Sequence, residues 1–174
     1  LFEAISAELG PLPIIAEDLG LITPEVTALR EACGFPGMRI LQFAFGSGPK
    51  NPYLPHNLER HAVAYTGTHD NETTLGWWDS APTGERSSAL DYLGPCIATE
   101  PHWTLVRAAS QSVVNTVVVP FQDVLGLDTH HRMNTPGMAT GCWEWRFEWS
   151  QVNHEPAARL AAMTRAHGRW PEEH

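Results

Sequence analysis

Residues 62–71 read Ala-Val-Ala-Tyr-Thr-Gly-Thr-His-Asp-Asn. This stretch is the strongest indication of the fold, because an apolar, strand-like run is followed directly by polar and charged side chains. Residues 12–20 have the same layout, with Leu-Pro-Ile-Ile-Ala before Glu-Asp-Leu-Gly. Parallel barrels display their catalytic groups where the strands end. The two stretches therefore predict carboxylates at strand ends around one pocket. Such an arrangement suits sugar chemistry, since glycoside cleavage needs paired carboxylates.

Strand-like and helix-like segments alternate along the chain. Apolar runs predict strands at residues 12–16, 38–45, 62–66 and 116–121. Three- or four-residue apolar spacing, caps and composition predict helices near residues 1–9, 24–33, 85–93, 101–113 and 155–160. This alternation implies an α/β fold of parallel βαβ units, with strands covered on both faces. Four units make about half of a (β/α)8 barrel, and an open doubly wound sheet is the alternative.

Composition and charge narrow the classes of protein. A hydrophobic content of 43% with 18% charged residues is typical of a globular domain. The net charge of −9, with scattered basic residues, argues against a nucleic-acid or membrane-surface partner. No apolar run approaches the ~18 residues of a membrane helix, and no leader is visible. The 3 cysteines are far apart, which argues against a disulfide framework or zinc motif, so we expect a cytoplasmic protein.

The chain is shorter than the predicted fold requires. A complete (β/α)8 barrel takes roughly 250 residues, whereas this chain has 174 and begins with Leu1. We therefore expect residues 1–174 to form part of a catalytic barrel domain that is truncated at its N-terminus.

Glu17 and Asp18 directly follow the first strand-like run. Because side chains alternate along an extended segment, one of the two carboxylates should point into the pocket while the other braces the loop. A helix cap or a loop hydrogen bond is the alternative role for either carboxylate.

His69, Asp70 and Asn71 crowd the end of another strand-like run. Three adjacent polar groups at that position are difficult to explain by packing. One alternative is a turn in which Asp70 or Asn71 caps the next helix. Another is a metal site, although the three side chains lack a regular ligand spacing and have no obvious companion ligands.

Several motifs together resemble one enzyme family, the 4-alpha-glucanotransferases of glycoside hydrolase family 77, called amylomaltases or disproportionating enzymes. The motifs cover most of the chain, follow the family's order and are far more specific jointly than singly. They lie at residues 13–20, 34–38, 41–45, 51–56, 65–71, 132–137 and 143–146.

The resemblance implies an α-amylase-type barrel whose strands five to eight lie in this chain. Glu17, after the fifth strand, would be the general acid/base, and Asp70, after the seventh, would stabilise the transition state. His69 and Asn134 would bind the sugar, and no cofactor or metal is implied. A proton-donating Glu17 needs a raised pKa, which burial or a neighbouring carboxylate such as Asp18 would supply.

The chain departs from the family's pattern in ways that bear on activity. The family's nucleophile is an aspartate after the fourth strand, upstream of this chain, so we expect the chain alone to be inactive. Cys142 stands where the family usually has asparagine, and Gly46 where it often has a polar residue. Both positions bear on local sugar contacts.

Other candidate residues have structural explanations. Asp123 either braces the pocket or caps a short helix. Exposed loops are expected for His56, His61, His130 and His131 rather than a metal site. Several tryptophans could stack on sugar rings, but we expect them in the core. They are Trp77, Trp78, Trp143, Trp145 and Trp149.

The sequence therefore predicts the C-terminal half of a 4-alpha-glucanotransferase. Its partners would be maltooligosaccharides and α-1,4-glucans, with glucose as an acceptor. One rival is an α-amylase-like hydrolase that uses the same carboxylates with water as acceptor. The other is a non-catalytic half-barrel that only binds glucan.

Overall fold

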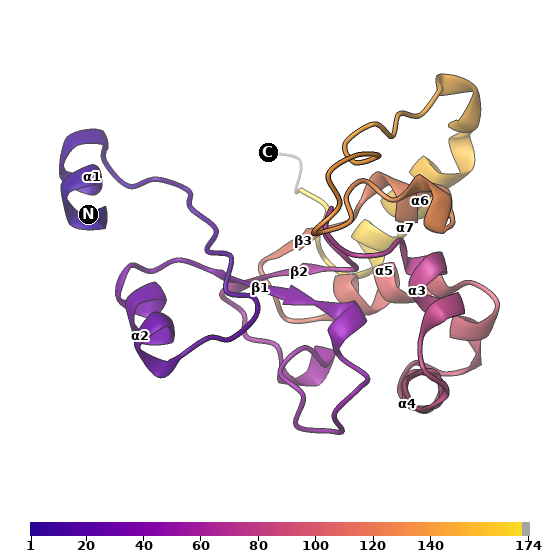
Figure 1. Cartoon of the computed structure of the whole chain (residues 1–174), viewed down its shortest axis with the longest axis horizontal. Helices are drawn as coiled ribbons and strands as arrows, with labels where there is room; N and C mark the ends of the chain where they lie inside the picture. The colour runs from indigo at the N-terminus through magenta and orange to yellow at the C-terminus, as the bar shows by residue number, and fades with distance from the viewer. Residues whose placement is uncertain (172–174) are drawn as a thin grey trace.

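A parallel three-stranded sheet forms the centre of the computed structural model, which describes residues 1–171 (Figure 1). Its strands are β1 (Gly37–Ile40), β2 (Ala62–Tyr65) and β3 (Thr116–Val118), side by side in that order. The register pairs Ile40 with Tyr65 and Tyr65 with Val118. The predicted α/β class with a parallel sheet is confirmed.

Helices precede, separate and follow the strands. Helix α1 (Phe2–Leu9) and α2 (Pro24–Ala32) come before β1, and α3 (Thr74–Ser80), α4 (Thr83–Leu93) and α5 (Pro101–Gln111) connect β2 to β3. Helix α6 (Phe121–Leu125) and α7 (His154–Ala166) follow the last strand. Short 3-10 turns lie at Leu41–Phe43, Pro55–Asn57, Pro95–Ala98, Thr129–His131 and Trp149–Gln151. Helices are therefore present at every range where the sequence predicts one.

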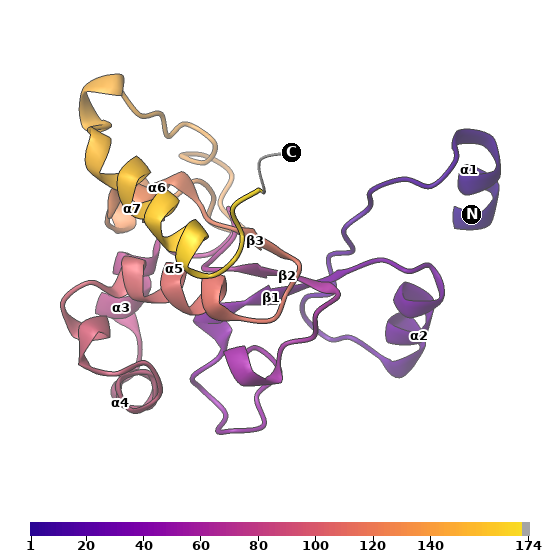
Figure 2. The same ribbon diagram turned by 180° about the vertical axis from the view of Figure 1, so that it is seen from behind.

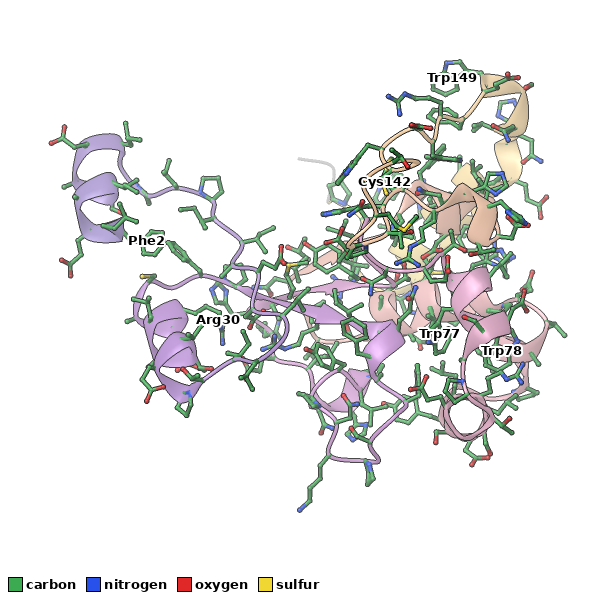
Figure 3. The ribbon with its side chains drawn as sticks, viewed as in Figure 1. Phe2, Arg30, Trp77, Trp78, Cys142 and Trp149 are labelled. Carbon is green, nitrogen blue, oxygen red and sulfur yellow. The ribbon has the colours of Figure 1, made fainter. Side chains whose placement is uncertain are left out.

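The core lies between one face of the sheet and the connecting helices. Ala62 and Ala64 of β2 pack with Leu105 of α5 and Trp77 of α3, the small alanines permitting close approach of α5. A second cluster joins α5 to α6 and α7, and in Figure 2 α5 and α7 lie in front of the sheet. Trp77 and Trp78, labelled in Figure 3, both belong to α3.

The other face of the sheet has no helix over it (Figure 1). Tyr65 and Val118, paired in the register, share this face. The side chain of Val118 is 40% exposed, although β strands of a parallel sheet are ordinarily covered on both faces. The expectation of two covered faces therefore holds for β1 and β2, whose Ile40 and Val63 on this face are buried, and is wrong for the edge strand β3.

The segment at residues 12–16 is not a strand, contrary to the sequence prediction. It contacts the sheet through one parallel bridge between Ala16 and Gly37, in which the Ala16 N–H donates to the Pro36 carbonyl at 2.9 Å. Pro11 and Pro13 lack the N–H groups that a ladder needs. The bridge nevertheless puts this segment where the prediction has it, beside β1.

Two strands end earlier than the sequence predicts. Strand β1 ends at Ile40 rather than Phe45, and β3 ends at Val118 rather than Phe121. The pairing of β1 with β2 and that of β3 with β2 both end at Tyr65. Beyond Tyr65 the segment after β2 turns away from the sheet, so β1 and β3 have no neighbouring strand to pair with. The apolar residues that follow, such as Leu41 and Phe45, instead enter the core.

The N-terminal part extends away from the sheet (Figures 1 and 2). Helix α1 contacts the remainder of this part through Phe2, whose ring lies 5.1 Å from that of Phe35. Within residues 1–171, no helix combines the length and apolar character needed to cross a bilayer.

Candidate active site

The carboxyl ends of the strands open into one cavity of about 890 Å³. Its walls come from the segments that follow the Ala16 bridge, β1, β2 and β3, so residues far apart in sequence meet there. Three of the four predicted site residues line it, namely Glu17, His69 and Asp70. Its other polar lining residues are Tyr53, Tyr65, Thr68, Asn71, Glu72, Thr73, Gln122 and Arg132.

Glu17 and Asp18 point in different directions, as the alternation of side chains predicts. Glu17 lines the cavity and is exposed. The Asp18 carboxylate accepts a hydrogen bond from the Met38 N–H at 2.6 Å and pairs with Arg39 at 3.0 Å and Arg30 at 3.4 Å. Asp18 is thus the brace, and its charge is paired with two arginines.

Gly37 is required where Asp18 approaches the start of β1. A Cβ atom on residue 37 would overlap the Asp18 carboxylate. The backbone can therefore come close enough for the Met38 N–H to donate to that carboxylate only because residue 37 lacks a side chain. This contact fixes the segment that carries Glu17 against β1.

Tyr65, the last residue of β2, lies near Glu17. Burial raises the pKa of the Tyr65 phenol, and the negative charge of nearby Glu17 adds to the rise. The cavity surroundings of Glu17 itself are open, because its side chain is exposed and Asp18 is committed to arginines. The described residues thus provide neither the burial nor the unpaired carboxylate of Asp18 that the sequence predicts around Glu17.

Asp70 is held by residues from the segment after β3. The Asn134 side-chain N–H donates to Asp70 Oδ1 at 2.5 Å, and the Asn134 backbone N–H donates to the His69 carbonyl at 3.1 Å. His69 Nε2 lies 3.3 Å from the same Asp70 oxygen. The fourth predicted residue, Asn134, is therefore brought to the other two although it does not line the cavity itself.

Arg132 ties the same two loops together with a forked side chain. Its Nη2 donates to the Asp70 carbonyl and its Nε to the Asn134 carbonyl, each at 2.8 Å. Its Nη1 lies 3.4 Å from a Glu72 carboxylate oxygen. The planar guanidinium suits this task because its donors have fixed directions.

The 66–73 turn is closed by residues other than Asp70. Asn71 Oδ1 accepts from the Thr68 N–H at 2.9 Å and from its hydroxyl at 2.7 Å. Thr73, not Asp70 or Asn71, caps α3 by accepting from the Gly76 N–H at 3.1 Å. The capping alternative is therefore wrong, and the Asp70 carboxylate is left to face the cavity and Asn134.

Asp123 lies behind this turn, buried at the start of α6. It accepts hydrogen bonds from the hydroxyls of Thr66 at 2.5 Å and Thr74 at 2.7 Å, and from the Thr74 N–H at 2.7 Å. Burial raises the pKa of the Asp123 carboxyl, while these bonds oppose the rise. Asp123 braces both ends of the turn that carries His69 and Asp70.

The remaining candidates divide between core and surface. Trp77 is buried as expected, but Trp143 and Trp149 are exposed, so the core expectation is wrong for them. Neither Cys142 nor Gly46 is among the described residues that line the cavity. His56 contacts Tyr92 and His131 contacts Asp128. Within residues 1–171, no group of three or more His, Cys, Asp or Glu side chains could hold a metal ion.

Sequence reasoning missed Arg132 and Glu72 as parts of the site. Arg132 begins the 132–137 motif, which was the available signal, but its partners Asp70 and Glu72 lie 62 and 60 residues earlier. No spacing rule connects such distant residues. For Asp123, only the burial shown by the structure decides between bracing and capping.

Comparison with known proteins gives consistent matches. The sequence profile of the family described as 4-alpha-glucanotransferase matches residues 1–152. The 4-alpha-glucanotransferase of Synechocystis sp. is 48% identical over 171 residues, which are 97% of this chain and 34% of that protein. The 4-alpha-glucanotransferase of Thermus thermophilus is 47% identical over 173 residues, covering 95% of this chain and 35% of that protein.

A solved structure shares the fold. Amylomaltase from Streptococcus agalactiae, in complex with acarbose, aligns with a TM-score of 0.93 and 33% identity. The alignment covers 98% of this chain and 35% of that one. The present chain thus spans about one third of the length of the relatives that it matches.

Proposed function

Because this chain belongs to the 4-alpha-glucanotransferase family, we propose that the protein carrying it transfers segments of α-1,4-glucans to glucose or glucan acceptors with retention of configuration. The observation that carries this proposal is the meeting in one cavity of Glu17, directly after the Ala16 bridge, and Asp70, in the turn after β2. Paired carboxylates around one cavity are what glycosyl transfer through an oxocarbenium-like transition state requires.

In this proposal Glu17 moves the proton. Its carboxyl group protonates the glycosidic oxygen while a nucleophilic carboxylate from outside this chain attacks the anomeric carbon, so that the glycosidic bond breaks, the released glucan leaves with the proton and a glycosyl-enzyme forms. Glu17, now a carboxylate, then removes the proton from the hydroxyl of the acceptor sugar, whose oxygen attacks the anomeric carbon and displaces the nucleophilic carboxylate. Transfer exceeds hydrolysis when an acceptor sugar reaches the glycosyl-enzyme before water does.

Asp70 stays charged and stabilises the positive charge that develops on the sugar ring. Its hydrogen bond from Asn134 and its proximity to His69 fix the direction of its carboxylate. His69, on the cavity wall, donates to or accepts from sugar hydroxyls. Asn134 has one side-chain N–H committed to Asp70, which leaves its amide oxygen free to accept a hydrogen bond from the sugar.

The chain supplies strands five to eight of the catalytic barrel, with residues 1–174 as part of that domain. The partly exposed Val118 on the edge strand β3 supports this proposal, because a complete barrel has no edge strand. The nucleophile then comes from a preceding strand outside this chain.

The proposed activity is tested with the complete protein that contains this chain, by measuring whether it disproportionates maltotriose. Transfer predicts longer oligosaccharides together with free glucose. A net gain in reducing ends without longer products would instead indicate hydrolysis, and unchanged maltotriose would indicate a binding module.

Substitution of Glu17 tests its role in the same protein. Glu17→Gln keeps the shape of the side chain but removes its proton, so we expect turnover to fall by about 10²–10⁴-fold while maltoheptaose still binds. Glu59→Gln is the matched control, because Glu59 is exposed and does not line the cavity. Equal turnover of the Glu17→Gln and Glu59→Gln proteins would refute the assignment.

A further inference from the structure

Trp143 has an unusual backbone conformation. Among residues 1–171 it is the only non-glycine residue with a positive φ angle, at 66°. Bulky side chains rarely occupy this region, and such conformations cluster at ligand-binding sites where the surrounding structure imposes them. We therefore expect the contacts of Trp143 to explain why its backbone adopts this conformation.

Hydrogen bonds on both sides impose this conformation. The Trp143 N–H donates to the Met133 carbonyl at 2.7 Å, and Arg146 Nη1 donates to the Trp143 carbonyl at 3.1 Å. One residue earlier, Cys142 Sγ accepts from the Thr135 N–H at 3.4 Å. These bonds close the 133–143 loop at its base, and Met133 at that base lines the cavity.

The resulting ring position is not explained by burial. Trp143 is 54% exposed, so the strained backbone does not serve to bury the indole. Its ring centroid lies 5.0 Å from that of His69, which lines the cavity, with 42° between the ring planes. Trp143 does not line the cavity itself, but its indole packs against a lining residue that is proposed to bind the sugar, with part of its surface open to solvent.

We propose that Trp143 is a stacking platform for a glucose unit of the glucan chain, adjacent to the unit held by His69. This inference rests on the proposed function. The C–H groups on the face of a glucose ring are apolar and pack on a flat aromatic surface, while the sugar hydroxyls at the ring edge stay in water or bind polar groups. A platform held by its backbone is also pre-organised, so little freedom is lost when the sugar binds.

Trp149 offers a natural comparison within the same aromatic segment. Its side chain is 79% exposed, and its ring packs against Phe147 at 5.2 Å rather than against a cavity residue. In Figure 3 it lies at the outer edge of the molecule, away from Cys142, the residue before Trp143. Exposure alone therefore does not distinguish the two tryptophans, whereas contact with the cavity wall does.

The test compares Trp143→Gly, Trp143→Phe and Trp149→Ala in the complete protein. Glycine adopts positive φ readily, so Trp143→Gly removes the ring while favouring the native backbone. Calorimetric titration with maltoheptaose should show Kd about tenfold higher for Trp143→Gly and roughly threefold higher for Trp143→Phe. Trp149→Ala should bind like the wild type. The melting temperature of Trp143→Gly should equal or exceed that of the wild type.

The outcomes separate the stacking role from the proposed activity. Wild-type and Trp143→Gly proteins that bind maltoheptaose equally would overturn the stacking role alone. Unchanged Kd with a reduced kcat would also overturn it, because the ring would then act only by supporting His69. A wild-type protein that neither binds maltoheptaose nor converts maltotriose would overturn both the stacking role and the proposed function.

Discussion

Glu17 and Asp70 face one cavity, yet the chain holds them in different ways. Asp70 lies in a turn that Asn134, Arg132 and Asp123 tie to the segment after β3. Glu17 lies on a segment joined to the sheet by one bridge at Ala16 and by the bonds of Asp18. Asp70 therefore has several independent restraints, whereas the position of Glu17 depends largely on one neighbouring carboxylate.

Because of this difference, the positions of the two carboxylates should be unequally sensitive to substitution of their neighbours. A network with several members keeps its geometry when one bond is lost, whereas removal of one carboxylate that several donors share breaks all of its bonds at once and leaves buried charge without its main partner. Substitutions on the two sides should accordingly have effects of different size and kind. All the following measurements concern the complete protein.

The largest effect should come from Asp18→Ala, which removes the brace on the Glu17 side. It leaves the guanidinium of Arg30, only 7% exposed, with the exposed carboxylate of Glu31 at 3.6 Å as its remaining acidic partner, and it leaves the Met38 N–H without its acceptor. We expect the free energy of unfolding to fall by about 3 kcal/mol and kcat to fall by about a hundredfold. Urea denaturation and maltotriose kinetics measure the two quantities.

Asp18→Asn is the control for that change, because it keeps an oxygen for the Met38 N–H and loses only the charge. Its effect on both quantities should be smaller. If Asp18→Ala retains wild-type stability and kcat, then Glu17 does not depend on this brace and the contrast between the two sides disappears.

A smaller effect is expected from Arg132→Met on the Asp70 side. The change removes the bonds to the Asp70 and Asn134 carbonyls, but the Asn134 and Asp123 contacts remain. We expect kcat to fall by about tenfold, with a loss of unfolding free energy below about 1 kcal/mol. Arg132→Lys should recover little activity, since a single ammonium cannot replace the fork. A larger loss of kcat than in Asp18→Ala would reverse the comparison.

The smallest effect should be the pH dependence contributed by Asp123. Its pKa is raised by burial, so between the ordinary aspartate value of 3.8 and the raised one the native state binds more protons than the unfolded state. Its contribution to stability therefore decreases as pH rises through that window. Relative to Asp123→Asn, which does not titrate, the wild type should lose stability with rising pH.

Denaturation of both proteins at several pH values measures that difference. The pKa of nearby His102 is lowered by burial, which gives stability the opposite slope, and the charge of Asp123 opposes that lowering. Because Asp123→Asn removes this charge, both proteins carry His102→Gln in the measurement, so that His102 does not contribute to the difference. A stability difference that rises with pH would show that the hydrogen bonds from Thr66 and Thr74 outweigh the burial of Asp123.

Local patterns predicted much of the architecture. The helix expected at residues 85–93 is Thr83–Leu93, and the division between Glu17 and Asp18 follows from the alternation of side chains. The family read from motifs is confirmed by the profile match and by the relatives. Strand ends were the weak point, because a strand continues only while a neighbour pairs with it, and β2 stops at Tyr65.

The α/β class, the family and the residues that carry the proposed chemistry are predictable from the sequence alone, because periodicity and motifs are local properties of a chain. The contacts by which Asn134 and Arg132 hold Asp70, Asp123 braces the turn and Trp143 packs against His69 are visible only in the folded molecule. These contacts join residues about 50 to 75 positions apart in the sequence. Their partners are selected by the packing of loops at the strand ends, which no short pattern encodes.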